Sequence, residues 1–415
     1  EFRRVLFRSV LYQCIYILQP SSMKGDLMFM FFDFRNYFRM VRLAIREKDR
    51  RGRRTARFMM LVVVPIMAPL HAICCFLDYI FFPRLWRLKV ETPVFIIGHA
   101  RSGTTLMHRL MTRDPDRYSY FLAYEMAFPS LTEKKILRLL GLIDRRFLSS
   151  RFHKKLTAKE DKILEKSRDV HYTGLYSPEE DDFVLTFSCA SGMSIVLFPY
   201  MDQLDFYYLD EWPRKRRQKW MGGYRQFVRR QLLLNGRGKT HLSKNPTFNG
   251  RVEALIEAFP DARFVVMARD PREAIPSLLK LLKDSWRRMG WKDERTEESL
   301  QILARQSIHS YWYPFKALED HPQTKWTVVD YRELVGSPKR TVEEVYEKLG
   351  LEMTPEYTAV LEEEENRARK HKTEHRYTLD EFGIDADALR DELAELFDRF
   401  GWENQIPMPA GETIG

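Results

Sequence analysis

The sequence predicts an α/β fold of the P-loop-like, three-layer α/β/α kind, in which helices cover both faces of a parallel sheet. Four short runs of apolar or β-branched residues have the pattern of buried strands, and each is followed by a helical pattern. These runs are Val94–Ile97, Thr240–Ser243, Phe264–Ala268 and Trp326–Val329. Alternating strands and helices favour a parallel sheet whose ligands lie at the carboxyl ends of the strands. A helical cap and an N-terminal membrane-associated helical element complete the expected architecture.

The composition bounds the class of protein. A chain of 415 residues with 44% hydrophobic residues can bury a large core, as one catalytic domain with additions. Its net charge of +10 suits an anionic cofactor or an anionic membrane surface. Nucleic acid is not an expected partner, because the sequence has no zinc-ligand spacing and no RNA-binding motif. Four cysteines, none in a C-x-x-C pair, favour a reducing compartment, so we expect the catalytic domain in the cytoplasm.

The N-terminal part differs from the rest of the chain. Residues 1–22 show no signal-peptide pattern, and we expect them to be a leader of doubtful, non-native origin before a start at Met23. Residues 23–90 form a basic and aromatic element. Its arginines recur at steps of three and four residues, next to aromatic residues, at Arg35, Arg39, Arg42 and Arg46. This pattern is typical of an amphipathic helix that lies in a membrane interface.

An uncharged apolar stretch follows at Phe58–Leu77. Its roughly 20 residues would extend about 30 Å as a helix, enough to cross a bilayer. Pro65 and Pro69 are expected to break this helix near its middle. We interpret residues 28–90 as a membrane-binding element that is either a re-entrant hairpin or one span. The alternative is a helical pair packed on the catalytic domain.

The loop after the first strand carries the strongest functional signal. Gly98 and Gly103 are separated by four residues and are followed by Thr104 and Thr105, where a helical pattern begins. The spacing matches a P-loop, but Thr104 replaces the P-loop lysine and Arg101 lies inside the loop. Such a loop suits an anion held by a guanidinium, hydroxyls and backbone amides, with no metal. A nucleotide kinase or NTPase is the alternative, and the missing lysine argues against it.

Three blocks in this order identify the chain as similar to sulfotransferases that use 3′-phosphoadenosine 5′-phosphosulfate (PAPS), of the bacterial, membrane-associated type. Residues 93–107 resemble the family's 5′-phosphosulfate loop, and residues 262–279 resemble its 3′-phosphate site. Residues 327–351 resemble the strand, Tyr-x-x-Leu and helix that close the nucleotide side. The resemblance implies a sulfotransferase domain over 91–415, with a helical cap at 131–238 and a closing C-terminal segment at 351–415.

The resemblance also implies site residues. PAPS would be the co-substrate, and no metal is expected. Its phosphosulfate would contact the loop residues Gly98, Arg101, Ser102, Gly103, Thr104 and Thr105, and its 3′-phosphate would contact Arg269 and Ser277. The C-terminal segment 371–384 resembles a bacterial segment that closes over the nucleotide, which assigns phosphate contacts to His375 and Arg376. Tyr331 is expected either to contact adenine or to be a core aromatic residue.

The catalytic base is expected to be Glu125, because family members place a glutamate in this interval after the loop. Lys244 is expected to stabilise the leaving oxygen, with Arg101 sharing the phosphosulfate charge. The histidine that many relatives carry after this lysine is replaced by Phe248, and His241 lies on its other side. A second acidic cluster at 177–183 offers Glu180 or Asp181 as the base, unless it is only an acidic helix N-terminus. His171 and His108 are weaker candidates.

Two further expectations concern the acceptor and its access. Residues 283–298, with Trp286, Gly290 and Trp291, resemble a lid, or else form a solvated loop. A membrane element beside the domain favours a lipid-linked or amphipathic alcohol, such as a glycolipid or a sterol-like compound, and leaves a soluble carbohydrate open. A catalytically inactive, membrane-bound member of the family is a further alternative.

Overall fold

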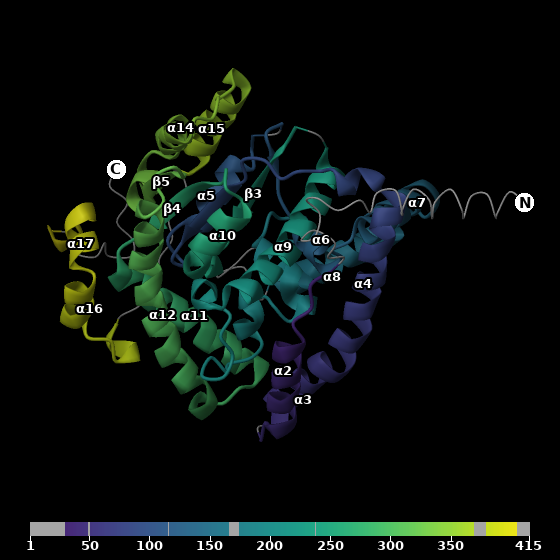
Figure 1. Ribbon diagram of the computed structural model, residues 1–415, viewed down its shortest axis with the longest axis horizontal. Coiled ribbons are helices and arrows are strands. Elements are labelled where there is room, and N and C mark those ends of the chain that lie inside the picture. Colours follow the sequence, from purple (N-terminus) through teal and green to yellow (C-terminus); the bar gives the residue numbers. More distant parts are fainter. Residues whose placement is uncertain are drawn as a thin grey trace, which may run out of the picture.

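A parallel sheet lies at the centre of the molecule (Figure 1). The structure is a computed structural model that describes residues 30–48, 50–114, 116–165, 174–236, 238–368 and 379–404. Within these residues the sheet has five strands in the order β2-β3-β1-β4-β5. Their bounds are β1 Val94–Gly98, β2 Tyr118–Ser119, β3 Thr240–Lys244, β4 Arg263–Ala268 and β5 Lys325–Asp330. The four predicted strands are confirmed, and β2 is a short addition at the edge.

The central strands are buried on both faces because they are apolar along their whole length. All five residues of β1 are buried. Val94 lies opposite Leu242 of β3 on one side and Arg263 of β4 on the other, so β1 is hydrogen-bonded along both edges. The carboxyl ends of β1, β3 and β4 consequently meet at one edge of the sheet.

Helices cover both faces, as the fold class predicts. Val94 and Ile96 pack with α5 (Thr104–Met111), α14 (Pro338–Leu349) and α15 (Pro355–Ala368). Phe95 and Ile97 face a larger core on the other side. That core is formed with the helices α9 Arg214–Asn235, α10 Val252–Ala258, α11 Pro271–Met289 and α12 Asp293–Glu319. The alternation of β1 side chains between the two cores is the two-residue period of a strand.

The segment 283–298 is not a lid. It forms the end of α11, a turn at Gly290 with a φ of 88°, and the start of α12. Trp286 and Trp291 are both buried, and the indole of Trp286 donates a hydrogen bond to the carbonyl of Ile195 at 2.9 Å. The expectation was wrong because these two tryptophans belong to the core and not to a mobile surface.

The expected cap region contains two kinds of helix. Helices α7 (Leu131–Phe147) and α8 (Arg151–Glu165) follow the short α6 (Ala123–Ala127) and extend away from the body of the molecule, whereas α9 packs into the core. Between α8 and α9 the chain forms short 3₁₀ turns at 181–188 and 192–196. The C-terminal helices α16 (Ala386–Glu392) and α17 (Ala394–Phe400) lie on the side of α12, where Arg399 packs 4.9 Å from the ring centre of Phe315.

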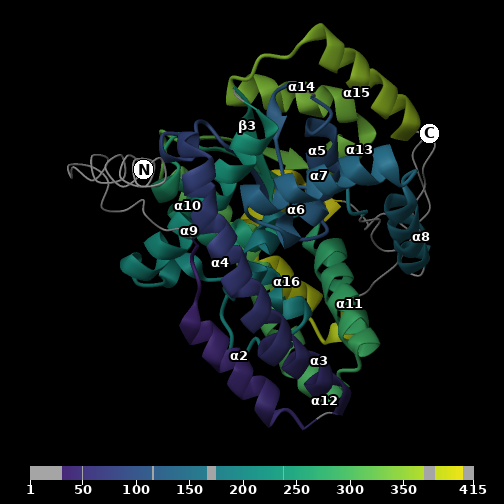
Figure 2. The same cartoon turned by 90° about the vertical axis from the view of Figure 1, so that its right-hand side faces the viewer.

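The N-terminal element is a pair of antiparallel helices that pack on the domain (Figure 2). The first is α2 (Phe34–Arg46). The second runs unbroken from Arg51 to Phe81 through α3 (Arg50–Phe58), a π-helical turn at Met59–Val63 and α4 (Val64–Phe81). Neither Pro65 nor Pro69 breaks it. At Pro65 the preceding π turn relieves the clash that the proline ring would otherwise make with the helix backbone. The expectation for residues 1–22 lies outside the described residues.

Candidate active site

A cavity of about 1130 Å³ lies at the carboxyl ends of the strands. The loop after β1 forms its polar end, with Arg101, Thr104 and Arg269 among the residues that line it. Apolar side chains form much of the rest of the wall, including Met126, Phe183, Phe187, Ile195, Leu204 and Leu278. The cavity therefore has a cationic end, where an anion can bind, and an apolar end of considerable volume.

The loop after β1 is curled tightly against its neighbours. Gly98 has a φ of 131°, and a Cβ there would lie 2.3 Å from the carbonyl oxygen of Met267. Gly103 has a φ of 89°, and its Cβ would lie 2.6 Å from the ring of Tyr331. Both positions require glycine on steric grounds. Helix α5 begins directly after Gly103, so the N–H groups of its first turn face the loop, as in an anion-binding site.

The hydroxyl residues of the loop have different roles. Ser102 is buried, and its hydroxyl donates to the carbonyl of His99, which fixes the curl of the loop. Thr104 and Thr105 line the cavity. Lys244, at the end of β3, donates to the hydroxyl of Thr105 at 3.4 Å.

The structure brings together four predicted residues from distant parts of the chain. The Nε of Arg101 donates to the hydroxyl of Ser277 at 3.1 Å. Arg269 donates to the carbonyl of Arg101 at 3.0 Å, and its guanidinium lies 4.3 Å from the ring centre of Tyr331. Glu273, one turn along α11, forms an ion pair with Arg269 at 2.9 Å. Two guanidinium groups therefore lie beside the glycine loop, in a geometry suited to phosphate or sulfate.

Lys244 lies directly behind the cavity wall. It is almost fully buried, and its ammonium forms an ion pair with Glu180 at 2.9 Å. Glu180 and Thr105, its two partners, both line the cavity. The structure thus places Lys244 and Glu180 together near the loop.

Glu125 lies elsewhere. It is not among the described residues that line the cavity, and only 1% of its surface is exposed. One carboxylate oxygen accepts from the backbone of Leu122 at 3.1 Å and from Gln231 at 2.6 Å. The other accepts from Tyr124 and from Arg138, each at 3.2 Å. These contacts cap the start of α6 and join it to α7 and α9.

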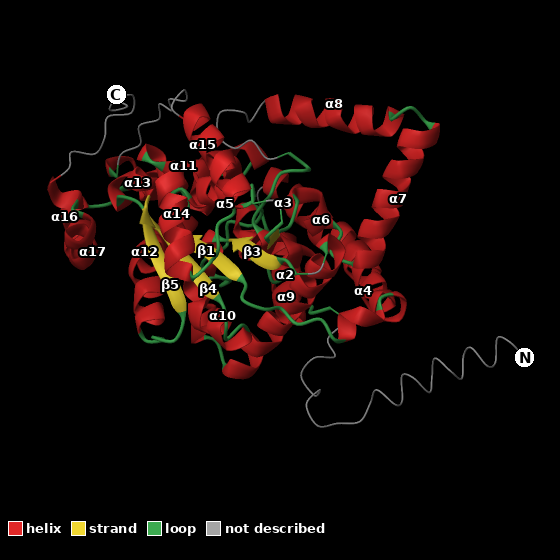
Figure 3. Cartoon of the chain, turned by 90° about the horizontal axis from the view of Figure 1, so that it is seen from above, coloured by secondary structure: helices red, strands yellow, loops and turns green. Residues whose placement is uncertain are grey.

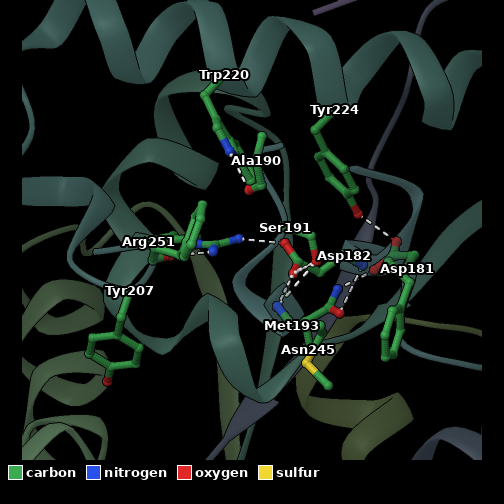
Figure 4. Close-up of polar contacts among 12 residues, drawn as sticks. Asp181, Asp182, Ala190, Ser191, Met193, Tyr207, Trp220, Tyr224, Asn245 and Arg251 are labelled. Atoms are coloured by element: carbon green, nitrogen blue, oxygen red, sulfur yellow. Dashed lines mark hydrogen bonds and ion pairs between the residues drawn. The ribbon is translucent and has the colours of Figure 1, made fainter. Parts of the chain in front are cut away.

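The acidic cluster is anchored by its two aspartates (Figure 4). Asp181 accepts hydrogen bonds from the hydroxyls of Tyr224 at 2.5 Å and Ser243 at 2.9 Å, and it also pairs with His241 and Asn245. Asp181 is buried beside β3 and is not among the described residues that line the cavity.

Asp182 points the other way and fixes the following turn. Its carboxylate accepts from the hydroxyl of Ser191 at 2.8 Å and from the backbone of Met193 at 3.2 Å. It also forms a buried ion pair with Arg251 at 2.7 Å. With both aspartates bound inside, the preceding residues Glu179 and Glu180 are held at the cavity wall.

Glu179 is the residue that sequence reasoning missed. It lines the cavity, and burial raises its pKa to about 7, although the nearby cations of Lys244 and Arg109 pull the pKa down. The neighbouring Glu180 raises it further. The run Glu-Glu-Asp-Asp was the only signal in the sequence, and it does not separate Glu179 from the three acids that follow.

Two buried histidines near the loop, His108 and His99, have lowered pKa values. Burial holds the pKa of His108 well below its usual value, and burial lowers that of His99, which lines the cavity and stacks on Tyr311, to about 3. Phe248 is a core residue. His171, His375 and Arg376 lie outside the described residues. Within the described ranges, no group of three or more histidine, cysteine or acidic residues is arranged to hold a metal.

Comparison with known proteins places this geometry in a family. The model of a sulfotransferase family matches residues 93–355. The chain is 27% identical over 340 residues to the omega-hydroxy-beta-dihydromenaquinone-9 sulfotransferase Stf3 of Mycobacterium bovis, and equally to that of Mycobacterium tuberculosis. Each alignment covers 77% of this chain and 78% of the relative.

Solved structures share the fold. The sulfotransferase STF9 of Mycobacterium avium superposes with a TM-score of 0.69 at 19% identity, over 92% of this chain and 94% of that one. The sulfotransferase STF1 of Mycobacterium tuberculosis H37Rv gives 0.64 at 17% identity, over 87% and 92%. The α/β architecture and its five-stranded parallel sheet are therefore those of known sulfotransferases.

Proposed function

Because this chain belongs to the sulfotransferase family, we propose that PAPS is its sulfuryl donor and that an amphipathic alcohol is its acceptor. One observation carries the proposal. The two arginines beside the glycine loop, Arg101 and Arg269, lie at one end of a cavity whose other end is large and apolar. The cationic end suits the donor, and the apolar end suits the body of the acceptor.

The residues at the cationic end fit the donor's anionic groups. The glycine loop and the first turn of α5 would hold the 5′-phosphosulfate, where Gly98 and Gly103 leave no room for a Cβ. Arg269 and Ser277 would hold the 3′-phosphate, and Tyr331 is available beside Arg269 for the nucleotide. When bound, PAPS supplies an activated sulfuryl group whose bridging oxygen leaves on adenosine 3′,5′-bisphosphate.

Glu179 is the proposed base. It accepts the proton of the acceptor hydroxyl as the hydroxyl oxygen bonds to sulfur, and the electron pair of the broken S–O bond stays on the departing phosphate oxygen. Lys244 and Arg101 stabilise the charge that develops on that oxygen. Glu179 is favoured over Glu125, which is held in a capping network, and over Glu180, which is ion-paired with Lys244.

The acceptor class rests on the cavity and on the relatives. The wall beyond the loop is formed largely by leucine, isoleucine, methionine and phenylalanine side chains. Such a wall suits the apolar body of an acceptor. The relatives from Mycobacterium bovis and Mycobacterium tuberculosis act, by name, on a hydroxylated menaquinone derivative. A lipid-like alcohol is therefore preferred over a soluble carbohydrate.

The donor assignment is tested by calorimetric binding of adenosine 3′,5′-bisphosphate without metal, compared with ATP and Mg²⁺. We expect binding of the bisphosphate, and a loss of roughly 10–100-fold in Arg269→Ala, because a charged forked contact is removed. Arg269→Lys should restore only part of the affinity. The exposed Arg340→Ala serves as the control. Preference for ATP and Mg²⁺, or unchanged binding in Arg269→Ala, would overturn the donor assignment.

A further inference from the structure

The long N-terminal helix carries a continuous exposed apolar face. We define this face by Phe58, Ile66, Ile73 and Ile80, which recur every seven or eight residues and are each more than half exposed. The neighbouring helix α7 adds exposed Leu139, Leu140 and Phe147. Contiguous apolar surface on this scale marks an interaction site, since isolated exposed residues would not form a stripe.

The opposite face of the same helix is tied to the catalytic domain by buried polar contacts. Asp78 forms an ion pair with Arg230 at 2.8 Å, and both side chains are fully buried. His71 contacts Glu133 at 2.6 Å. Crossing a bilayer would bring these charged groups into hydrocarbon or strip them of their partners, at high cost in either case. The helix is therefore long enough to span a membrane but bonded as part of a globular domain.

The neighbouring helix α2 carries a cationic stripe. On α2 the exposed side chains of Arg35, Arg39, Arg42 and Arg46 lie beside exposed Phe34 and Phe38. Helix α2 packs along the start of the long helix, where the hydroxyl of Tyr37 donates to the carbonyl of Met60 at 3.1 Å (Figure 2). Arginines beside apolar side chains complement anionic lipid headgroups above an acyl layer.

The cavity also reaches this side of the molecule. Leu156 of α8 lines the cavity and is itself about half exposed. Helix α7 packs beside α4, and α8 continues from the far end of α7, away from α4 (Figure 3). The apolar end of the cavity is therefore bounded in part by a helix that carries exposed apolar side chains.

We infer that the apolar face of the long helix, with the arginines of α2, docks the protein on the surface of an anionic lipid bilayer without crossing it. The face enters the headgroup and upper acyl region while the buried ion pairs stay intact. A lipid-like acceptor can then pass from the bilayer beside α8 into the cavity. This last step rests on the proposed function, whereas docking does not.

Co-flotation of the full chain with phosphatidylcholine vesicles, with and without phosphatidylglycerol, tests the docking. We expect Ile66→Glu/Ile73→Glu to weaken binding at least about tenfold, because carboxylates do not enter the acyl layer. Ile66→Leu/Ile73→Leu should bind normally, and Val335→Glu, on an exposed site of α13 (Tyr331–Gly336), controls for a carboxylate added elsewhere on the surface. Arg42→Ala/Arg46→Ala should lose roughly fivefold per arginine, on phosphatidylglycerol vesicles only.

Transfer between vesicles tests the mode of binding. A docked protein should move to a second vesicle population within minutes, whereas a spanning helix stays with the first. If the glutamate variants unfold at the same temperature as the wild type, their vesicle binding is compared between folded proteins. The proposal would be overturned if the Ile66→Glu/Ile73→Glu variant bound vesicles as well as the wild type, or if no protein moved between vesicles. It would also be overturned if the wild type were a dimer that this variant converts to a monomer while vesicle binding stays unchanged. None of these readouts depends on sulfuryl transfer.

Discussion

Two adjacent glutamates at the cavity wall differ in what their carboxylates meet. Glu180 is ion-paired with Lys244, so its carboxylate is already bound to a cation. Burial raises the pKa of Glu179 to about 7, so this carboxylate can accept and release a proton near neutral pH. This difference is not visible in the sequence, where four acids stand in a row and only the anchoring of Asp181 and Asp182 decides which of them reaches the cavity.

Replacing Glu179 tests its role as the base. Glu179→Gln should keep bisphosphate binding but lower kcat by roughly 10²–10⁴-fold, because general base catalysis is lost. In the wild type, kcat/KM should fall about tenfold for each pH unit below about 7, since the base must be ionised. Steady-state rates across pH measure both effects.

Two variants control this experiment. Lys244→Ala should move the acid limb to higher pH, because the Lys244 cation lowers the pKa of Glu179. Glu125→Gln should reduce stability through the lost contact with Arg138, with near-normal turnover of the folded protein. The reverse result, full turnover in Glu179→Gln and loss in Glu125→Gln, would assign the base to Glu125.

At the scale of elements, the sequence predicted what is locally encoded. The four main strands were predictable because each is a short apolar run bounded by turn residues. The glycine loop was predictable because its steric demands fall on single positions, Gly98 and Gly103. The two-residue β2 was not predictable, since its pairing with β3 is set by neighbours distant in sequence. The lid predicted at residues 283–298 was wrong because an aromatic, charged segment has the same sequence pattern whether its tryptophans, here Trp286 and Trp291, are buried or exposed.

The loop geometry predicts a specific effect of one methyl group. In Gly103→Ala the Cβ would meet the Tyr331 ring, and a φ of 89° strains an alanine. We expect a loss of about 1–3 kcal/mol in stability and, because the ring is displaced, at least about tenfold weaker bisphosphate binding. Gly141→Ala, in the exposed helix α7 with nothing within 4 Å, should instead gain up to about 1 kcal/mol. Calorimetry measures the bisphosphate affinity of both variants, and thermal unfolding measures their stability. Normal bisphosphate affinity in Gly103→Ala would contradict the predicted role of the loop.

At the scale of the whole molecule, the N-terminal helices are part of the catalytic domain's packing. Sequence reasoning left a hairpin, a span and a packed pair open, because hydropathy reports only the composition of the helix. The deciding partners are Glu133 and Arg230, which lie far along the chain from His71 and Asp78. Their identity as partners depends on tertiary structure and has no local signature.

Breaking the ion pair between Asp78 and Arg230 should therefore destabilise the whole molecule. Arg230→Met leaves the buried Asp78 carboxylate without its cation, and we expect a loss of about 3–5 kcal/mol in the free energy of unfolding. Chemical denaturation measures it, together with faster proteolysis within Arg51–Phe81. The exposed Arg214→Met should change stability by less than about 0.5 kcal/mol. Equal stability of the two variants would mean that the helix is held by its apolar contacts alone.

The ion pair between Asp78 and Arg230 joins parts of the chain that are made at different times. The two residues are 152 positions apart, a distance that a ribosome covers in roughly 8–30 s at about 5–20 residues per second. During that interval the helix Arg51–Phe81 is complete, apolar and long enough to enter a translocation channel, while the cation that will hold it has not yet been synthesised. The ion pair that holds this helix on the domain can therefore form only after Arg230 has been synthesised.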